Sequence, residues 1–119
     1  MATKKLMECS FLIPLRRDKN FSDGKLHRRT AWKWLDDRLM EFDGATRALE
    51  LYEGWYPDPD TGKRVKDRSR KFWTAVPPGE IERLRSLLQE ACQVFWQKFI
   101  YLSIAGQVEF VKGPDDEGD

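Results

Sequence analysis

Aromatic, acidic and basic side chains alternate between positions 52 and 73, and this stretch is the part of the chain best suited to binding chemistry. The run YEGWYPDPDTGKRVKDRS carries aromatic residues into a turn rich in proline and aspartate, and a basic stretch follows. Aromatic rings stack on flat ligand groups, and lysine or arginine side chains bind anions. We expect a ligand or partner surface formed by Tyr52, Glu53, Trp55, Arg68, Arg70, Trp73 and Tyr101.

The basic stretch itself has two interpretations. Its six cations are Lys63, Arg64, Lys66, Arg68, Arg70 and Lys71, and Asp67 is the one acid among them. They could bind single-stranded nucleic acid weakly, with neighbouring aromatic rings stacking on the bases. We prefer a solvated strand end whose cations pair with Glu50 and Glu53, because 21 basic and 20 acidic residues leave a formal charge of only +1.

Few residues have the types and spacing that catalysis needs. His27 is the single histidine and follows the polar loop, and Asp36–Asp37 and Asp58–Asp60 are carboxylate pairs. The chain has no phosphate-binding glycine loop, dinucleotide fingerprint or nucleophile elbow. We therefore expect no catalytic residue, no metal site and no cofactor.

The bulk composition indicates one cytoplasmic domain. A chain of 119 residues with 40% hydrophobic residues can bury a core. The apolar run near the start is broken by Glu8 and Pro14, and no stretch is long enough to span a membrane. Cys9 and Cys92 are expected to be small buried hydrophobes, with a disulfide as the alternative. We expect a single domain over residues 1–112 and a disordered acidic tail over 113–119.

Hydrophobic periodicity predicts strands and helices in the order βαββαβ. Period-two alternation predicts strands over 6–15, 45–56, 64–77 and 100–111, and helical spacing predicts helices over 26–44 and 79–99. Residues 57–63 carry the turn chemistry that joins the second and third strands into a hairpin. This order predicts an α+β, ferredoxin-like fold, with a four-stranded antiparallel sheet in the order 4-1-3-2 and both helices on one face.

The run FDGATRALELYEGWYPDPDTGKRVKDRS combines a helix end with Phe-x-Gly, a strand with Gly-x-Trp, a turn and Val-x-Asp-x-Ser. It resembles a group of small uncharacterised bacterial proteins, often found near mobile elements and expected to be ferredoxin-like. The resemblance extends over most of residues 7–111. It implies a fold and assigns no activity or catalytic residue.

The expected sheet leaves one face without a covering layer, so function should lie on that open face or on the hairpin. The preferred hypothesis is a non-catalytic binding or interaction module, homodimeric through the open sheet face. The alternative is a cofactor-independent enzyme that acts on a small aromatic or apolar molecule held between sheet and helices, with Tyr52, Glu53, His27 and Trp73 around it. A further alternative is weak nucleic-acid binding through residues 63–71. A membrane partner is not expected.

Overall fold

The computed structural model describes residues 5–42, 44–58 and 60–114. Most of the predicted tail, residues 115–119, lies outside these ranges. The elements are β1 (Met7–Pro14), α1 (Arg29–Leu39), β2 (Ala45–Arg47), β3 (Tyr52–Pro57), β4 (Arg64–Val76), a 3-10 turn (Pro78–Glu80), α2 (Ile81–Val94), β5 (Phe99–Ile104) and β6 (Gln107–Lys112). The α+β class is correct, but the four-stranded ferredoxin-like sheet is wrong.

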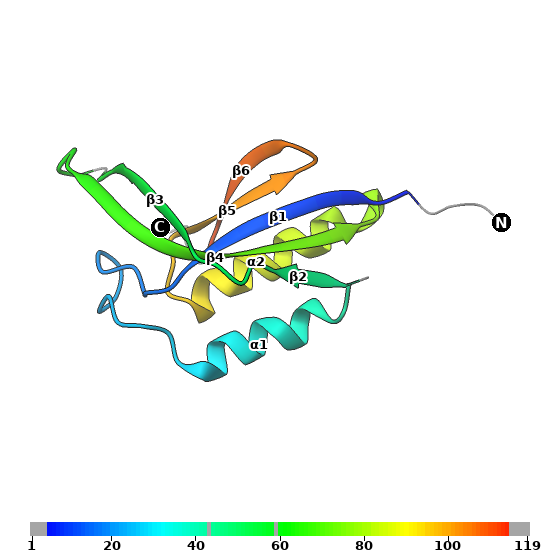
Figure 1. The fold of residues 1–119 in the computed structure, drawn as a ribbon, viewed down its shortest axis with the longest axis horizontal. Coiled ribbons are helices and arrows are strands. Elements are labelled where there is room, and N and C mark those ends of the chain that lie inside the picture. Colours follow the sequence, from blue (N-terminus) through cyan, green and yellow to red (C-terminus); the bar gives the residue numbers. More distant parts are fainter. Residues whose placement is uncertain (1–4, 43, 59, 115–119) are drawn as a thin grey trace.

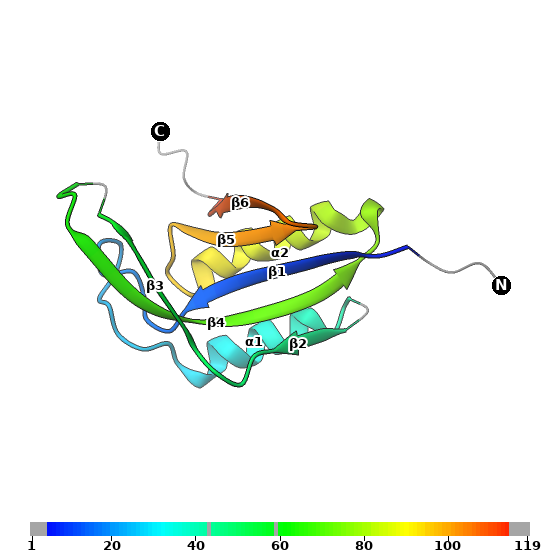
Figure 2. The same cartoon turned by 45° about the horizontal axis from the view of Figure 1, so that its top comes forward.

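The described strands form one antiparallel six-stranded sheet in the order β2-β4-β1-β5-β6, and β3 pairs with the outer part of β4 (Figure 2). The expected order 4-1-3-2 does not describe this arrangement, because two of the four predicted strands are each broken into two. The long strand β4 holds the sheet together by pairing with β1, β2 and β3.

The first break separates β2 from β3. Arg47 pairs with Phe72 and Tyr52 pairs with Ser69, so residues 48–51 face only residues 70 and 71 of β4. The extra length bulges out of the sheet, and Leu49 is fully exposed although it continues the alternating pattern. Beyond this bulge, β3 and the outer part of β4 leave the sheet as a two-stranded arm (Figure 1).

The second break is a tight turn between β5 and β6. Ala105 and Gly106 have φ values of 49° and 89°, the left-handed conformations that a two-residue type I′ hairpin turn requires at both positions. Ile104 pairs with Gln107 on either side of the turn. The turn folds the predicted final strand back on itself and gives the sheet its outer strand β6.

Both helices lie on the same side of the sheet (Figure 1). Helix α2 buries the stripe that its spacing predicts, including Leu84, Leu88 and Ala91. From the sheet, Phe11 and Phe72 stack at 5.2 Å between ring centroids and complete the core. Each such side chain contributes about 1.5–3 kcal/mol through burial. No helix in the described part of the chain is long and apolar enough to cross a membrane.

Ion pairs join the helical layer to the sheet edge. The Arg85 guanidinium of α2 donates to both carboxylate oxygens of Glu109 on β6, at 2.8 and 2.9 Å, and also contacts Glu82. The two carboxylates raise the pKa of Arg85, which stays charged. The pair fixes β6 over α2 at the edge where the sheet ends.

Candidate functional site

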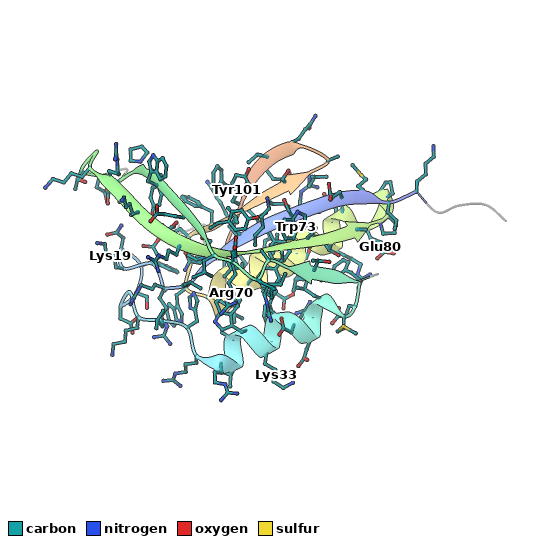
Figure 3. All side chains as sticks on the ribbon, viewed as in Figure 1. Lys19, Lys33, Arg70, Trp73, Glu80 and Tyr101 are labelled. Carbon is teal, nitrogen blue, oxygen red and sulfur yellow. The ribbon has the colours of Figure 1, made fainter. Side chains whose placement is uncertain are left out.

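A cleft of about 460 Å³ lies between the β3–β4 arm and the loop that joins β1 to α1. We call residues 15–27 the cleft loop. Figure 3 shows Lys19 of this loop beneath the arm. The lining residues combine apolar, acidic and basic groups: Pro14, Leu15, Arg16, Arg17, Asp18, Lys19, Asn20, Gly24, Leu26, Glu53, Tyr56, Val65, Lys66, Asp67, Arg68 and Gln97.

Turn chemistry fixes the tip of the arm. The Asp58 carboxylate accepts hydrogen bonds from the backbone N–H groups of Asp60 and Thr61, at 2.7 and 3.1 Å. These bonds lower the pKa of Asp58, and a weaker bond from the Asn20 side chain links the tip to the cleft loop. Gly62, with φ of 72°, supplies the left-handed position that the turn needs. The turn thus fixes how the two strands of the arm are joined.

Backbone hydrogen bonds hold the cleft loop in a compact form. Arg17 N–H donates to the Lys25 carbonyl at 2.8 Å, and Arg16 forms an isolated antiparallel bridge with Leu26. The Arg17 side chain pairs with Asp23 at 2.9 Å. The loop is therefore a small folded unit of its own, with its ends close together.

The C-terminal end of α2 anchors that loop. Gln97 is buried, and its side-chain amide donates to the carbonyls of Arg16 at 2.8 Å and Phe95 at 2.9 Å. Asp18 N–H also donates to the Trp96 carbonyl at 3.0 Å. The cleft wall is thereby tied to a core helix far away in sequence.

The helix end that provides these contacts is a Schellman turn. Gln97 N–H donates to the Cys92 carbonyl and Trp96 N–H donates to the Gln93 carbonyl. Trp96 occupies the left-handed position with φ of 52°, where glycine is usual. A bulky residue is strained there, and its ring contacts Phe21 of the cleft loop at 6.2 Å between centroids. The strained residue thus also contributes to fixing the loop.

His27 is the last residue of the cleft loop, and its contacts are those of a residue that supports the fold. Its Nε2 lies 2.8 Å from the Pro14 carbonyl, and its ring packs edge-on against Phe95 at 4.9 Å and Trp32 at 5.6 Å. Burial lowers the pKa of His27, and the nearby Arg17 charge lowers it further, against the opposing effect of the hydrogen bond to Pro14. The ring is neutral at pH 7, with the Nε2–H donating to Pro14.

Asp67 and Tyr56 meet on the arm side of the cleft. Burial raises the pKa of the Asp67 carboxyl, and no ion pair or hydrogen bond joins that carboxyl to another described residue. Burial also raises the pKa of the Tyr56 phenol, and the carboxylates of Asp67, Asp18 and Asp58 raise it further. This part of the cleft is negative, which favours a cationic ligand group.

The cations of the arm have exposed side chains, and two of them, Lys66 and Arg68, also belong to the cleft lining. Exposure alternates along β4, so that Val65 and Asp67 are half-buried while Arg64, Lys66 and Arg68 are exposed. Within the described residues, no ion pair joins any cation between 63 and 71 to Glu50 or Glu53, although Glu53 is directly opposite Arg68. Lys66 and Arg68 form a basic rim beside the negative interior.

The structure divides the predicted surface between four places. Glu53 and Arg68 line the cleft, whereas Trp55 is 61% exposed on the arm and outside the lining. Arg70 lies 5.1 Å from the Trp32 ring on the helix side of the sheet. Trp73 and Tyr101 lie on the opposite side of the sheet (Figure 3).

That opposite side is the open face. Trp73, Ser10 and Ser103 form one cross-strand row, and Lys71, Leu12, Tyr101 and Phe110 form the next. Lys71 lies over the rings of Tyr52 and Trp73, at 5.3 and 5.0 Å. At the β5–β6 edge, Phe110 contacts Phe99 and Tyr101 and remains 61% exposed. These aromatic residues are not part of the cleft lining.

Several cleft residues were not predicted from the sequence. Asp67 is the one acid in a basic run, and this isolation is a signal that could have identified it. Tyr56 follows the predicted surface residue Trp55 directly in sequence but was not included in that surface. Gln97 and the cleft loop give no local signal, because their role depends on contacts between distant segments.

Comparisons with known proteins support the fold and change the functional expectation. No protein-family model and no curated protein sequence is similar to this chain. The chain is similar to a phage SAM lyase solved in complex with S-methyl-5′-thioadenosine, with 14% identity, a TM-score of 0.68, and coverage of 98% of this chain and 97% of that one. It is also similar to a phage SAM lyase in the apo state, with 14% identity, a TM-score of 0.62, and coverage of 93% and 92%.

At 14% identity, the likeness shows the fold of the chain. Both of these matched structures, which align over almost their whole length, are of an enzyme, phage SAM lyase, and this finding contradicts the preferred expectation of a non-catalytic interaction module. It favours the enzyme alternative instead. The six-stranded α+β fold is therefore shared, along nearly its entire length, with phage SAM lyase.

Proposed function

We propose that this chain is an enzyme that cleaves S-adenosylmethionine (SAM) and releases S-methyl-5′-thioadenosine, with the substrate held in the cleft between the arm and the cleft loop. The observation that carries the proposal is the mixed lining of that cleft in a fold like that of phage SAM lyase. Its volume of about 460 Å³ lies within the range of small-molecule sites.

The chemistry of SAM matches this lining. The substrate has a flat adenine base, a positively charged sulfur and an amino acid group with a carboxylate. Leu26, Val65 and Tyr56 supply apolar and aromatic surface for the base. Arg16 and Arg68 supply guanidinium groups at the rim for the carboxylate. A purely apolar ligand would leave these charged groups without a role.

The proposed reaction breaks the bond between the sulfur and the side-chain carbon of the amino acid group, and the bonding electron pair goes to the sulfur. A lyase adds no water. Either a base removes a proton from the adjacent carbon and a carbon–carbon double bond forms, or the substrate's own carboxylate oxygen displaces the sulfur and a lactone forms. The cleft has to bind the amino acid group in a reactive conformation and limit access of water. The buried Gln97 and the compact cleft loop support such a fixed geometry.

The test is to incubate the purified protein with SAM and measure S-methyl-5′-thioadenosine by chromatography against a protein-free control. Val65→Trp should fill the cleft and abolish the activity, because Val65 is half-buried in its lining. Leu49→Trp is the matched control, because Leu49 is fully exposed on the bulge outside the cleft. Absence of the product with wild-type protein, or equal activity of both variants, would contradict the proposal.

We also infer that copies of the chain associate through the open face. Phe99, Val108 and Phe110 are 48%, 49% and 61% exposed there and lie next to Tyr101. A contiguous apolar patch of this kind favours burial against a second copy. A homodimer and a cytoplasmic location are parts of this proposal, and solution mass and cell fractionation test them.

A further inference from the structure

The surroundings of Asp67 differ from those of an ordinary solvated residue on a strand. Its carboxylate is half-buried within a strand whose neighbouring positions are exposed cations. Lys66 and Arg68 flank it in sequence, but the alternation of the strand places them on the exposed side. Among the described residues none donates to the Asp67 carboxylate. A half-buried carboxylate without a protein partner is less well solvated than an exposed one, and a cationic partner would compensate for that loss.

Space beside this carboxylate is left by Gly54. Gly54 is directly opposite Asp67 on β3, and a Cβ atom at position 54 would lie 3.6 Å from Asp67 Oδ1. Because glycine has no side chain, one oxygen of the carboxylate is not covered from across the arm. The cleft lining includes Asp67 together with Tyr56, so that the carboxylate borders the cavity.

The electrostatic potential around Asp67 and Tyr56 is negative, although the rim of the cleft is basic. Burial and the carboxylates of Asp67, Asp18 and Asp58 all raise the pKa of Tyr56. Burial alone raises the pKa of Asp67, since no cation close to it offsets the effect. A cationic ligand group that enters here would pair with Asp67 and replace the lost hydration of the carboxylate.

We propose that Asp67 is the specificity-determining residue that reads the charge on the ligand's sulfur, so that the cleft binds a sulfonium in preference to a neutral thioether of the same skeleton. This inference rests on the proposed function and names what that site selects. Asp67 pairs with the positive centre, and Arg16 and Arg68, which also line the cleft, bind the carboxylate of the neighbouring amino acid group.

The same arrangement favours turnover. When the sulfur–carbon bond breaks, its electron pair stays on sulfur, and the sulfonium becomes a neutral thioether. The product then has no charge for Asp67 to attract. The carboxylate therefore holds the substrate more strongly than the product S-methyl-5′-thioadenosine, which is free to leave.

The experiment compares two analogues that lack the cleavable sulfonium bond. Sinefungin carries a protonated amine at the place of the methylated sulfur, and S-adenosylhomocysteine has a neutral sulfur there. Calorimetry on the wild-type protein should give at least tenfold tighter binding of sinefungin. Asp67→Asn should bring the two affinities to within about twofold, a loss equivalent to about 1 kcal/mol or more at 1.36 kcal/mol per tenfold.

The control is Glu50→Gln, which removes one negative charge at an exposed position outside the cleft lining. It should keep the tenfold preference, which separates a local effect from a change in net charge. Asp67→Asn removes a half-buried charge that has no protein partner and should melt at or above the wild-type temperature, so misfolding does not explain a loss of preference.

Each outcome has one meaning. Equal affinity of the two analogues for the wild type, or a preference that survives in Asp67→Asn, overturns the role of Asp67 and leaves the proposed function intact. Binding of neither analogue, together with no cleavage of SAM, overturns the proposed function and this inference with it. Loss of the preference in Asp67→Asn alone supports the inference.

Discussion

Phe110→Glu should weaken association of copies through the open face. Phe110 is 61% exposed in the isolated chain, and full burial of a phenylalanine side chain contributes about 1.5–3 kcal/mol. Covering the exposed part in a second copy therefore contributes about 1–2 kcal/mol, which a two-fold interface doubles to about 2–4 kcal/mol. Loss of this term raises the dissociation constant about 30- to 700-fold at 1.4 kcal/mol per tenfold. Burial of the new carboxylate would add to the loss.

Sedimentation equilibrium over a concentration series measures this change directly. Met40→Glu is the matched control, because Met40 is 79% exposed at the end of α1 in the helical layer, away from the open face. It should leave the dissociation constant unchanged. A wild-type protein that stays monomeric at the highest concentration would refute the reasoning, and so would equal dissociation constants for Phe110→Glu and the wild type.

Further predictions concern the stability of the fold. Phe72→Ala should lower the free energy of unfolding by about 3–5 kcal/mol, because the ring is 2% exposed and stacked in the core. Urea denaturation measures this free energy, and a loss below about 1 kcal/mol would contradict the packing of the ring. The folded-state pKa of His27 lies below its ordinary value of 6.5, so the unfolded chain binds the proton more tightly. The stability that His27 contributes above pH 6.5 is therefore lost as the pH falls through the folded-state pKa. Over this pH range the melting temperature of the wild type should fall more steeply than that of His27→Gln, and parallel curves would contradict this role of His27. A double-mutant cycle with Arg85→Ala and Glu109→Ala should give a coupling energy of about 0.3–1 kcal/mol, since both side chains are about one-third exposed. A coupling energy of zero would show that the ion pair does not contribute to the stability of the fold.

Local periodicity was sufficient to predict the elements that are packed on a regular face. The alternation of Cys9, Phe11 and Ile13 predicted β1, and these three side chains are fully buried. The stripe of α2 was equally clear, because its apolar spacing continues for several turns. The basic stretch and the turn before it predicted the hairpin of β3 and β4, which the pairing confirms.

The errors lie where alternation continues through a change of backbone. Leu49 and Leu51 keep the period-two pattern, yet both are exposed because the chain bulges there. The turn between β5 and β6 uses Ala105 in place of the asparagine or aspartate that marks most type I′ turns, so no signal divided the strand. Both breaks are decided by register against neighbouring strands, which local sequence does not specify.

The cleft could be predicted only in part for the same reason. Glu53 and Arg68 were expected to be near a ligand, since they belong to the arm. The opposite wall depends on Gln97, whose side chain reaches the Arg16 carbonyl from a helix end far along the chain. The partnerless state of Asp67 also depends on register, because one position further along β4 it would be on the exposed side.

The anchoring of the cleft loop by the end of α2 makes the two walls mechanically unequal. The loop wall is joined through Trp96 and Gln97 to the end of a core helix, so moving it away from the core breaks these hydrogen bonds. The arm wall is a two-stranded projection whose outer part pairs only with itself. A ligand in the cleft therefore lies between one wall that a core helix holds and one wall that strand pairing holds.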